Sequence, residues 1–164
     1  METSLGNPAV CAAILAALDA AGVAFELIEH APLTSTAHAA ELRGTPLEIG
    51  GKALVMKADD RFHVVVASSA ARLKSRFFRK SVGARRLRFA TRTELAEMTG
   101  LVPGCVPPFG TPILPFALHA DRGLLDRERI AFTPGLRTCS IVMASADWLA
   151  TAQPRLGDFL DTTA

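Results

Sequence analysis

The chain has 164 residues, a length typical of one domain with a single core. It is 49% hydrophobic and 21% charged, with a mean hydropathy of +0.27, which excludes a disordered polar chain. Three dispersed cysteines exclude a disulfide-rich module, and a net charge of +2 favours no partner by itself. We therefore expect one domain that spans residues 1–164.

The apolar stretches do not predict a membrane protein. The longest, residues 9–17 and 113–118, are shorter than the roughly 20 apolar residues that a membrane-spanning helix needs. The first ten residues contain Glu2 and no Lys or Arg, unlike the basic start of a secretory leader. We expect a soluble, cytoplasmic protein with no membrane partner.

The first half of the chain predicts two helices and three strands. Apolar residues at helical spacing follow Asn7-Pro8 and predict a helix that ends before Gly22. A strand over residues 23–30 comes next, and Thr34 or Ser35 begins a short helix through Leu42. Two apolar runs joined by a turn at Asp59-Asp60 predict a hairpin; these runs are residues 52–57 and 62–67.

The second half mixes short helices, strands and a rigid loop. A basic helix is expected before Gly83, and a helix over residues 93–98 ends at Gly100. Residues 103–110 contain too many Pro and Gly for a helix or a central strand and predict a constrained loop. Further predictions are strands at 113–118, 129–132 and 139–143, a helix capped by Ser145 through Leu149, and a weakly held tail at 154–164. This order of elements favours an α+β or mixed α/β fold.

The positive charge is concentrated in one segment. Residues 72–92 contain no acid and nine of the 18 Lys and Arg residues, namely Arg72, Lys74, Arg76, Arg79, Lys80, Arg85, Arg86, Arg88 and Arg92. Such a run indicates a polyanionic partner, although a solvated helix face with a basic loop gives the same pattern.

Familiar catalytic motifs are not found. The chain has no phosphate-binding glycine loop, no HExxH and no GxSxG, and its four histidines contain no i, i+4 pair. We therefore expect neither a metal nor another cofactor. Cys11 and Cys139 are interpreted as buried thiols, whereas Cys105, on a glycine loop, is either a pocket-lining residue or a nucleophile paired with a histidine.

Two features could support chemistry. Lys52 begins a strand after Gly50-Gly51, where a ligand or another backbone can come close; the alternative is a lysine that extends into water. In the loop, the amides of Gly104, Cys105, Val106, Phe109 and Gly110 could point inward and bind an oxyanion, and the alternative is a rigid structural turn.

Together these segments resemble a known family. Gly51-Lys52-Ala53-Leu54-Val55-Met56, followed by a second strand and by residues 99–110 with their GxxxP loop at Gly104–Pro108, is similar to the YbaK and prolyl-tRNA-synthetase-associated editing domains. The resemblance covers about residues 25–143 and implies a YbaK-like fold, with a central, mixed, barrel-like β-sheet flanked by helices. It also implies an aminoacyl-tRNA deacylase that works by substrate-assisted ester hydrolysis, without a protein nucleophile.

The resemblance assigns roles to residues. It implies catalytic positions at Lys52, Gly104, Cys105 and Val106, and substrate-binding positions at His30, Thr34, Lys52, Pro107, Pro108 and Gly110. The tRNA acceptor stem and 3′ end are expected to bind Arg72, Lys74, Arg76, Arg85, Arg86 and Arg88. The expected substrate is tRNA(Pro) with a small wrong amino acid, alanine first and then cysteine or serine, and prolyl-tRNA synthetase is a further candidate partner. Two alternatives stay open, a non-catalytic RNA- or partner-binding relative and a hydrolase of another small ester.

Overall fold

The computed structural model describes residues 4–160, which form five α-helices, two short 3-10 helices and two sheets. The elements follow in chain order: α1 (Pro8–Ala21), β1 (Phe25–Glu29), α2 (Thr36–Arg43), β2 (Gly51–Ala58), β3 (Arg61–Ser68), α3 (Ser75–Ser81), β4 (Leu87–Phe89), α4 (Arg92–Thr99), β5 (Ala117–Asp121), β6 (Arg129–Phe132), β7 (Cys139–Ala144), α5 (Ser145–Ala152) and β8 (Arg155–Gly157). The 3-10 helices are Leu47–Ile49 and Arg122–Asp126. The expected α+β class is confirmed.

Local capping explains where three helices begin. The Asn7 side chain accepts a hydrogen bond from the amide of Ala9 at the start of α1, and Ser35 caps α2 through the amide of His38. At α4, Thr91 and Glu94 form a reciprocal capping box. Glycines in the left-handed conformation end these same helices, at φ values of 68° to 72°.

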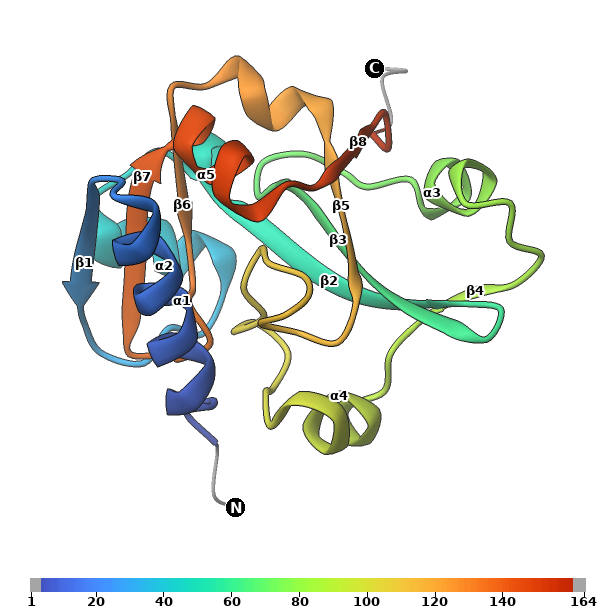
Figure 1. The fold of residues 1–164 in the computed structure, drawn as a ribbon, viewed down its shortest axis with the longest axis horizontal. Helices are drawn as coiled ribbons and strands as arrows, with labels where there is room; N and C mark the ends of the chain where they lie inside the picture. Colours follow the sequence, from blue (N-terminus) through green and yellow to red (C-terminus); the bar gives the residue numbers. More distant parts are fainter. Residues whose placement is uncertain (1–3, 161–164) are drawn as a thin grey trace.

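The strands form two sheets. β1-β7-β6 is antiparallel throughout, whereas the five-stranded sheet, in the order β4-β2-β3-β5-β8, combines the β2-β3 hairpin with parallel β5 and β8. Figure 1 shows α1 and α5 beside the smaller sheet, with α3 and β4 at the opposite end of the molecule. The predicted hairpin is confirmed, including its turn at Asp59-Asp60.

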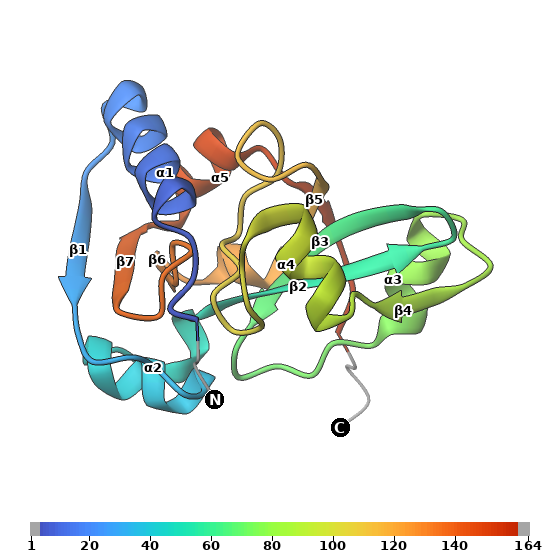
Figure 2. The same cartoon turned by 90° about the horizontal axis from the view of Figure 1, so that it is seen from below.

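The expectation of one barrel-like sheet is wrong. Closure would require the edge strands of the larger sheet, β4 and β8, to pair, but each has one neighbour. A single parallel bridge between Gly50 and Ala131 links the two sheets. The two sheets therefore remain open, and the Pro/Gly loop (yellow) lies between them (Figures 1 and 2).

The Pro/Gly loop is fixed by the main core. That core contains Ile14 and Leu18 of α1, Val106 and Phe109 of the loop, and Trp148 of α5. The buried indole Nε1 of Trp148 donates a hydrogen bond of 3.0 Å to the carbonyl of Pro108. The loop is therefore held rigidly by packing and by one buried hydrogen bond.

The strand expected at residues 113–118 is displaced. Residues 111–116 form a turn, in which the amides of Ile113 and Leu114 both donate to the carbonyl of Gly110, and β5 begins only at Ala117. Pro112 and Pro115 have no amide hydrogen to donate to a strand neighbour. The short strand β4 was not predicted, because its three residues lie within the basic run.

The C-terminal predictions also need correction. Ala144, not Ser145, occupies the cap position of α5, and the buried hydroxyl of Ser145 has no hydrogen-bond partner among the described residues. Residues 155–157 pair with β5, and Phe159 is buried with its amide bonded to the Asp121 carboxylate at 2.8 Å. Residues 154–160 are thus part of the fold, and the rest of the expected tail lies outside the described residues.

Candidate active site

A cavity of about 380 Å³ lies where α2, the beginning of β2 and the Pro/Gly loop meet. Figure 2 shows α2 close to the start of β2. Further residues come from the first turn of α4 and from the segment that joins β6 to β7. Segments that are far apart in the sequence therefore build this one site.

Lys52 is the first sequence-predicted residue in the cavity. It is half-buried at the beginning of β2, and it follows two glycines that are packed against neighbours. A Cβ at Gly50 would lie 2.5 Å from the hydroxyl of Ser69, and one at Gly51 would lie 2.8 Å from Ile130. The glycines thus allow close packing of the protein itself, and this packing fixes the strand that presents Lys52.

Arg43 also lines the cavity and was missed in the sequence. Its Nε donates to the hydroxyl of Ser140 at 2.8 Å, and its Nη2 donates to the hydroxyl of Thr133 at 3.1 Å. Burial lowers the pKa of Arg43 to about 10. The guanidinium is still charged at neutral pH, but it is held among neutral partners.

Arg137 is the second missed cation. Its Nε and Nη2 both donate to the carbonyl of Leu33, at 3.0 and 2.7 Å. With Lys52, Arg43 and Arg92 at the start of α4, it gives the cavity four cationic side chains. Among residues 4–160, no carboxylate, cysteine or histidine lines this cavity. Its chemistry suits an anionic ligand or an oxyanion.

The Pro/Gly loop contributes fewer groups than expected. Gly104 and Val106 line the cavity, but Cys105 is fully buried, with its Sγ donating to the carbonyl of Val102 at 3.2 Å. The amides of Cys105 and Phe109 donate within the loop, to Val102 and Pro107, so the expectation of inward-pointing amides is wrong at these two positions. Burial also raises the pKa of the Cys105 thiol.

The remaining substrate-binding candidates divide between the cavity and its support. Thr34 lines the cavity, and its amide donates to His38 at 3.1 Å. His30 does not line it, but its Nε2 lies 2.8 Å from the same Ser140 hydroxyl that Arg43 contacts. Pro107, Pro108 and Gly110 are buried and do not line it.

Comparison with known proteins shows the family of this chain. Residues 30–151 match the model of the aminoacyl-tRNA editing domain. This chain belongs to the aminoacyl-tRNA editing domain family. A multifunctional Ser/Thr-tRNA deacylase, ProXp-y of Escherichia coli K12, is 33% identical over 157 residues, which cover 91% of this chain and 92% of the relative. The resemblance seen in the sequence is confirmed, and so is the expected enzyme class, an aminoacyl-tRNA deacylase.

A solved structure supports the fold of the editing domain. A protein assigned provisionally as a trans-editing enzyme for prolyl-tRNA synthetase superposes with a TM-score of 0.80. At 24% identity it covers 93% of this chain and 97% of its own. This likeness shows the architecture and nothing about the substrate.

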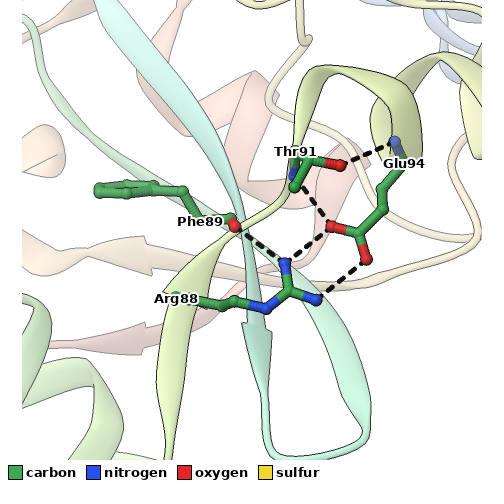
Figure 3. Close-up of polar contacts among 4 residues, drawn as sticks. All are labelled: Arg88, Phe89, Thr91 and Glu94. Carbon is green, nitrogen blue, oxygen red and sulfur yellow. Dashed lines mark hydrogen bonds and ion pairs between the residues drawn. The ribbon is translucent and has the colours of Figure 1, made fainter.

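The basic segment of the editing domain lies largely at the surface. Five of the six residues expected to bind tRNA are exposed, and Lys74 is half-buried; the exposed ones are Arg72, Arg76, Arg85, Arg86 and Arg88. Arg88 forms a bidentate pair with Glu94, at 2.7 and 3.0 Å, which lowers the pKa of Glu94 to about 2 (Figure 3). The amides of Arg85 and Arg86 bind the Asp59 carboxylate, so acids from outside the run fold against it.

Neither a membrane span nor a metal cluster is found in the part of the chain that the structure describes. No helix within residues 4–160 is long and apolar enough to cross a membrane. In the same range, no three His, Cys, Asp or Glu side chains gather in a way that could hold a metal ion.

Proposed function

We propose that this editing domain hydrolyses the ester of a small, hydroxyl-bearing amino acid, serine or threonine, from the 3′ end of tRNA. The observation that carries the proposal is the cationic cavity, which has hydroxyl groups in its wall and, among the described residues, no carboxylate, cysteine or histidine. Thr34, Ser35, Thr36, Ser69 and Thr133 supply these hydroxyls. The activity named for the Escherichia coli relative supports the same choice.

The absence of a carboxylate or histidine from the cavity wall, within the described residues, favours substrate assistance. Water attacks the carbonyl carbon of the ester, the bond to the ribose oxygen breaks, and a proton passes to that oxygen. The neighbouring ribose hydroxyl orients the water, so the protein supplies position and charge. Holding the ester and the water in place can contribute several kcal/mol, and each fixed donor to the oxyanion about 3 kcal/mol.

We assign Lys52, Arg43 and Arg137 as the donors that stabilise the negative charge developing on the carbonyl oxygen of the ester. The ammonium of Lys52 comes from the start of β2, and the two guanidinium groups are anchored by the hydroxyls of Thr133 and Ser140 and the carbonyl of Leu33. The amides of Gly104 and Val106 complete the candidates for oxyanion contact. Cys105, buried and bonded to Val102, is a support for this loop.

Thr133 is our candidate for recognition of the substrate hydroxyl. Its buried Oγ1 accepts a hydrogen bond from Arg43, which leaves its own hydrogen to donate to a second oxygen. Alanine, the first expectation from the sequence, would leave this group unpaired. A site built to bind a hydroxyl can discriminate strongly against an analogue that lacks one.

The test is a deacylation panel with Ser-, Thr-, Ala-, Cys- and Pro-tRNA, each made on tRNA(Pro) and on the cognate tRNA. We expect release of serine or threonine at least tenfold faster than alanine, and no measurable release of proline. Thr133→Val, which keeps the side-chain shape, should reduce this preference to below threefold. Thr36→Val, at an exposed hydroxyl of the same cavity, is the matched control. Equal rates for Ser- and Ala-tRNA in the wild type would contradict the hydroxyl assignment.

The same panel tests the reaction itself. Lys52→Ala should lower kcat/KM at least tenfold, about 1.4 kcal/mol, with little change in the unfolding midpoint, because Lys52 lies at a strand end. A wild-type protein that releases no amino acid from any charged tRNA would refute the proposed function.

A further inference from the structure

Phe89 is the most exposed large hydrophobic residue of those that the structure describes. It is 59% exposed, against 46% for Leu5 and 42% for Leu27. A single exposed apolar residue is ordinary on a protein surface, so its exposure alone indicates nothing. Its place on the sheet, relative to the cavity, decides its meaning.

Phe89 lies on the same face of the larger sheet as Lys52. Alternate residues of a strand share a face, so Lys52, Leu54 and Met56 of β2 point to one side. Phe89 of β4 is paired directly with Met56 and therefore shares that side. Four residues along β2, at about 3.3 Å each, and one strand spacing of about 4.8 Å separate its Cα from that of Lys52 by ~14 Å.

The backbone that carries Phe89 is held on both sides. The amide of Ala90 donates to the carbonyl of Val55 at 2.9 Å, and Nη1 of Arg88 donates to the carbonyl of Phe89 at 3.2 Å. The same guanidinium is paired with Glu94, which begins α4 through the capping box. Figure 3 shows the ring pointing away from this polar cluster. An exposed aromatic ring thus lies on a fixed backbone.

Cationic residues lie on both sides of Phe89 along the chain. The exposed Arg85 and Arg86 precede it, and Arg92, three residues later, lines the cavity. An exposed ring with cations before it in the chain, three residues from a cation that lines the cavity, is complementary to single-stranded nucleic acid. The phosphates meet the cations, and a base stacks on the ring.

We propose that Phe89 is a stacking platform for an unpaired nucleobase that precedes the 3′-terminal nucleotide of the bound tRNA. The proposal rests on the proposed function, because it places the aminoacylated end of the tRNA at Lys52. The ~14 Å from Lys52 is within the reach of a few unpaired nucleotides, since stacked ones rise about 3.4 Å each. The ring gives affinity without selecting a particular base, because every base has a π-face.

The kinetic test compares whole seryl-tRNA with seryl-adenosine, which has no preceding base. Phe89→Ala should raise KM for the tRNA about fivefold or more, the lower end of the effect of one stacked base, with kcat nearly unchanged. Its kcat/KM for seryl-adenosine should stay within twofold of the wild type. Phe89→Trp should retain tRNA activity, whereas Phe89→Leu, apolar but without a π-face, should behave like the alanine variant. Leu27→Ala is the control at another exposed apolar residue.

Three results would overturn the platform: an unchanged KM for tRNA in Phe89→Ala, full activity in Phe89→Leu, or equal losses on both substrates. The last would indicate a structural role or a protein contact instead. A binding assay separates this proposal from the proposed function. Uncharged tRNA should bind the wild type more tightly than tRNA lacking its unpaired 3′ nucleotides, and Phe89→Ala should reduce that difference about fivefold, because only the stacked base is lost. This readout holds even if the wild type releases no amino acid, and an equal difference in both proteins would again overturn the platform.

Discussion

Arg43 offers the sharpest separation of function from stability in this molecule. Burial lowers its pKa from 12.5 to about 10, so keeping the charge inside costs roughly 3 kcal/mol at ~1.36 kcal/mol per pKa unit. The cost is present at neutral pH, because the group is charged in both the folded and the unfolded state below pH 10. Hydrogen bonds to Ser140 and Thr133, each worth about 1.5–3 kcal/mol, offset it.

Replacing Arg43 by methionine removes both the desolvation cost and the hydrogen bonds, and it keeps a linear apolar side chain. We expect the free energy of unfolding to fall by no more than about 3 kcal/mol, because the two missing hydrogen bonds, together about 3–6 kcal/mol, are largely balanced by the missing desolvation cost. Deacylation should fall about 100-fold, since one fixed donor to a developing oxyanion contributes about 2.7–4 kcal/mol. Urea unfolding and kcat/KM for seryl-tRNA measure the two effects, with exposed Arg127→Met as the control. Activity within threefold of the wild type would refute the oxyanion role.

Three further predictions concern residues outside the reacting centre. Cys105→Ser should keep kcat within about threefold, because the buried thiol with its raised pKa has a structural role; an acyl-thioester trapped on Cys105 would contradict this. Burial lowers the pKa of His119 to about 4, with smaller contributions from His63 and Arg155. On acidification the unfolded chain, in which this histidine has a pKa near 6.5, therefore binds the proton before the folded protein does. Stability should therefore be complete above pH 6.5 and fall by up to about 3 kcal/mol on acidification to pH 4, and a urea midpoint with the same pH dependence in His119→Gln would argue against this assignment. In a plot of log binding constant against log salt concentration for tRNA, the double variant Arg85→Gln, Arg86→Gln should reduce the magnitude of the slope by about one unit for each lost phosphate contact. An unchanged slope would indicate that neither side chain contacts a phosphate.

The sequence was sufficient for features whose signals are local. The β2-β3 hairpin follows from alternating apolar residues on both sides of the Asp59 turn, and helix α2 follows from the Ser35 cap and Gly44. Lys52 was found because it begins that hairpin after two glycines. In each case the residues that carry the signal are neighbours along the chain.

The missed features depend on contacts between distant segments. Arg43 and Arg137 are separated by most of the chain, and each meets its partners only after the segments around α2 and β7 have packed together. In the sequence each is a single arginine within two residues of a glycine, at Gly44 and Gly135, a pattern that surface arginines share. Strand β8 was missed for the same reason, because parallel pairing with β5 cannot be recognised in three residues.

The two proposals assign catalysis to the cavity and affinity to Phe89 and the basic segment, and this division is consistent with an editing domain that needs few chemical groups. An aminoacyl ester is already reactive, so groups that contact it gain most by binding the developing charge more strongly than the ground state. Arg43, Lys52 and Arg137, for which we propose that task, line one cavity. Phe89 and the basic segment are assigned to parts of the tRNA that do not change during the reaction, so their binding energy is equal in both states. Substitutions in the cavity should therefore lower kcat, whereas substitutions at Phe89 or Arg86 should raise KM alone.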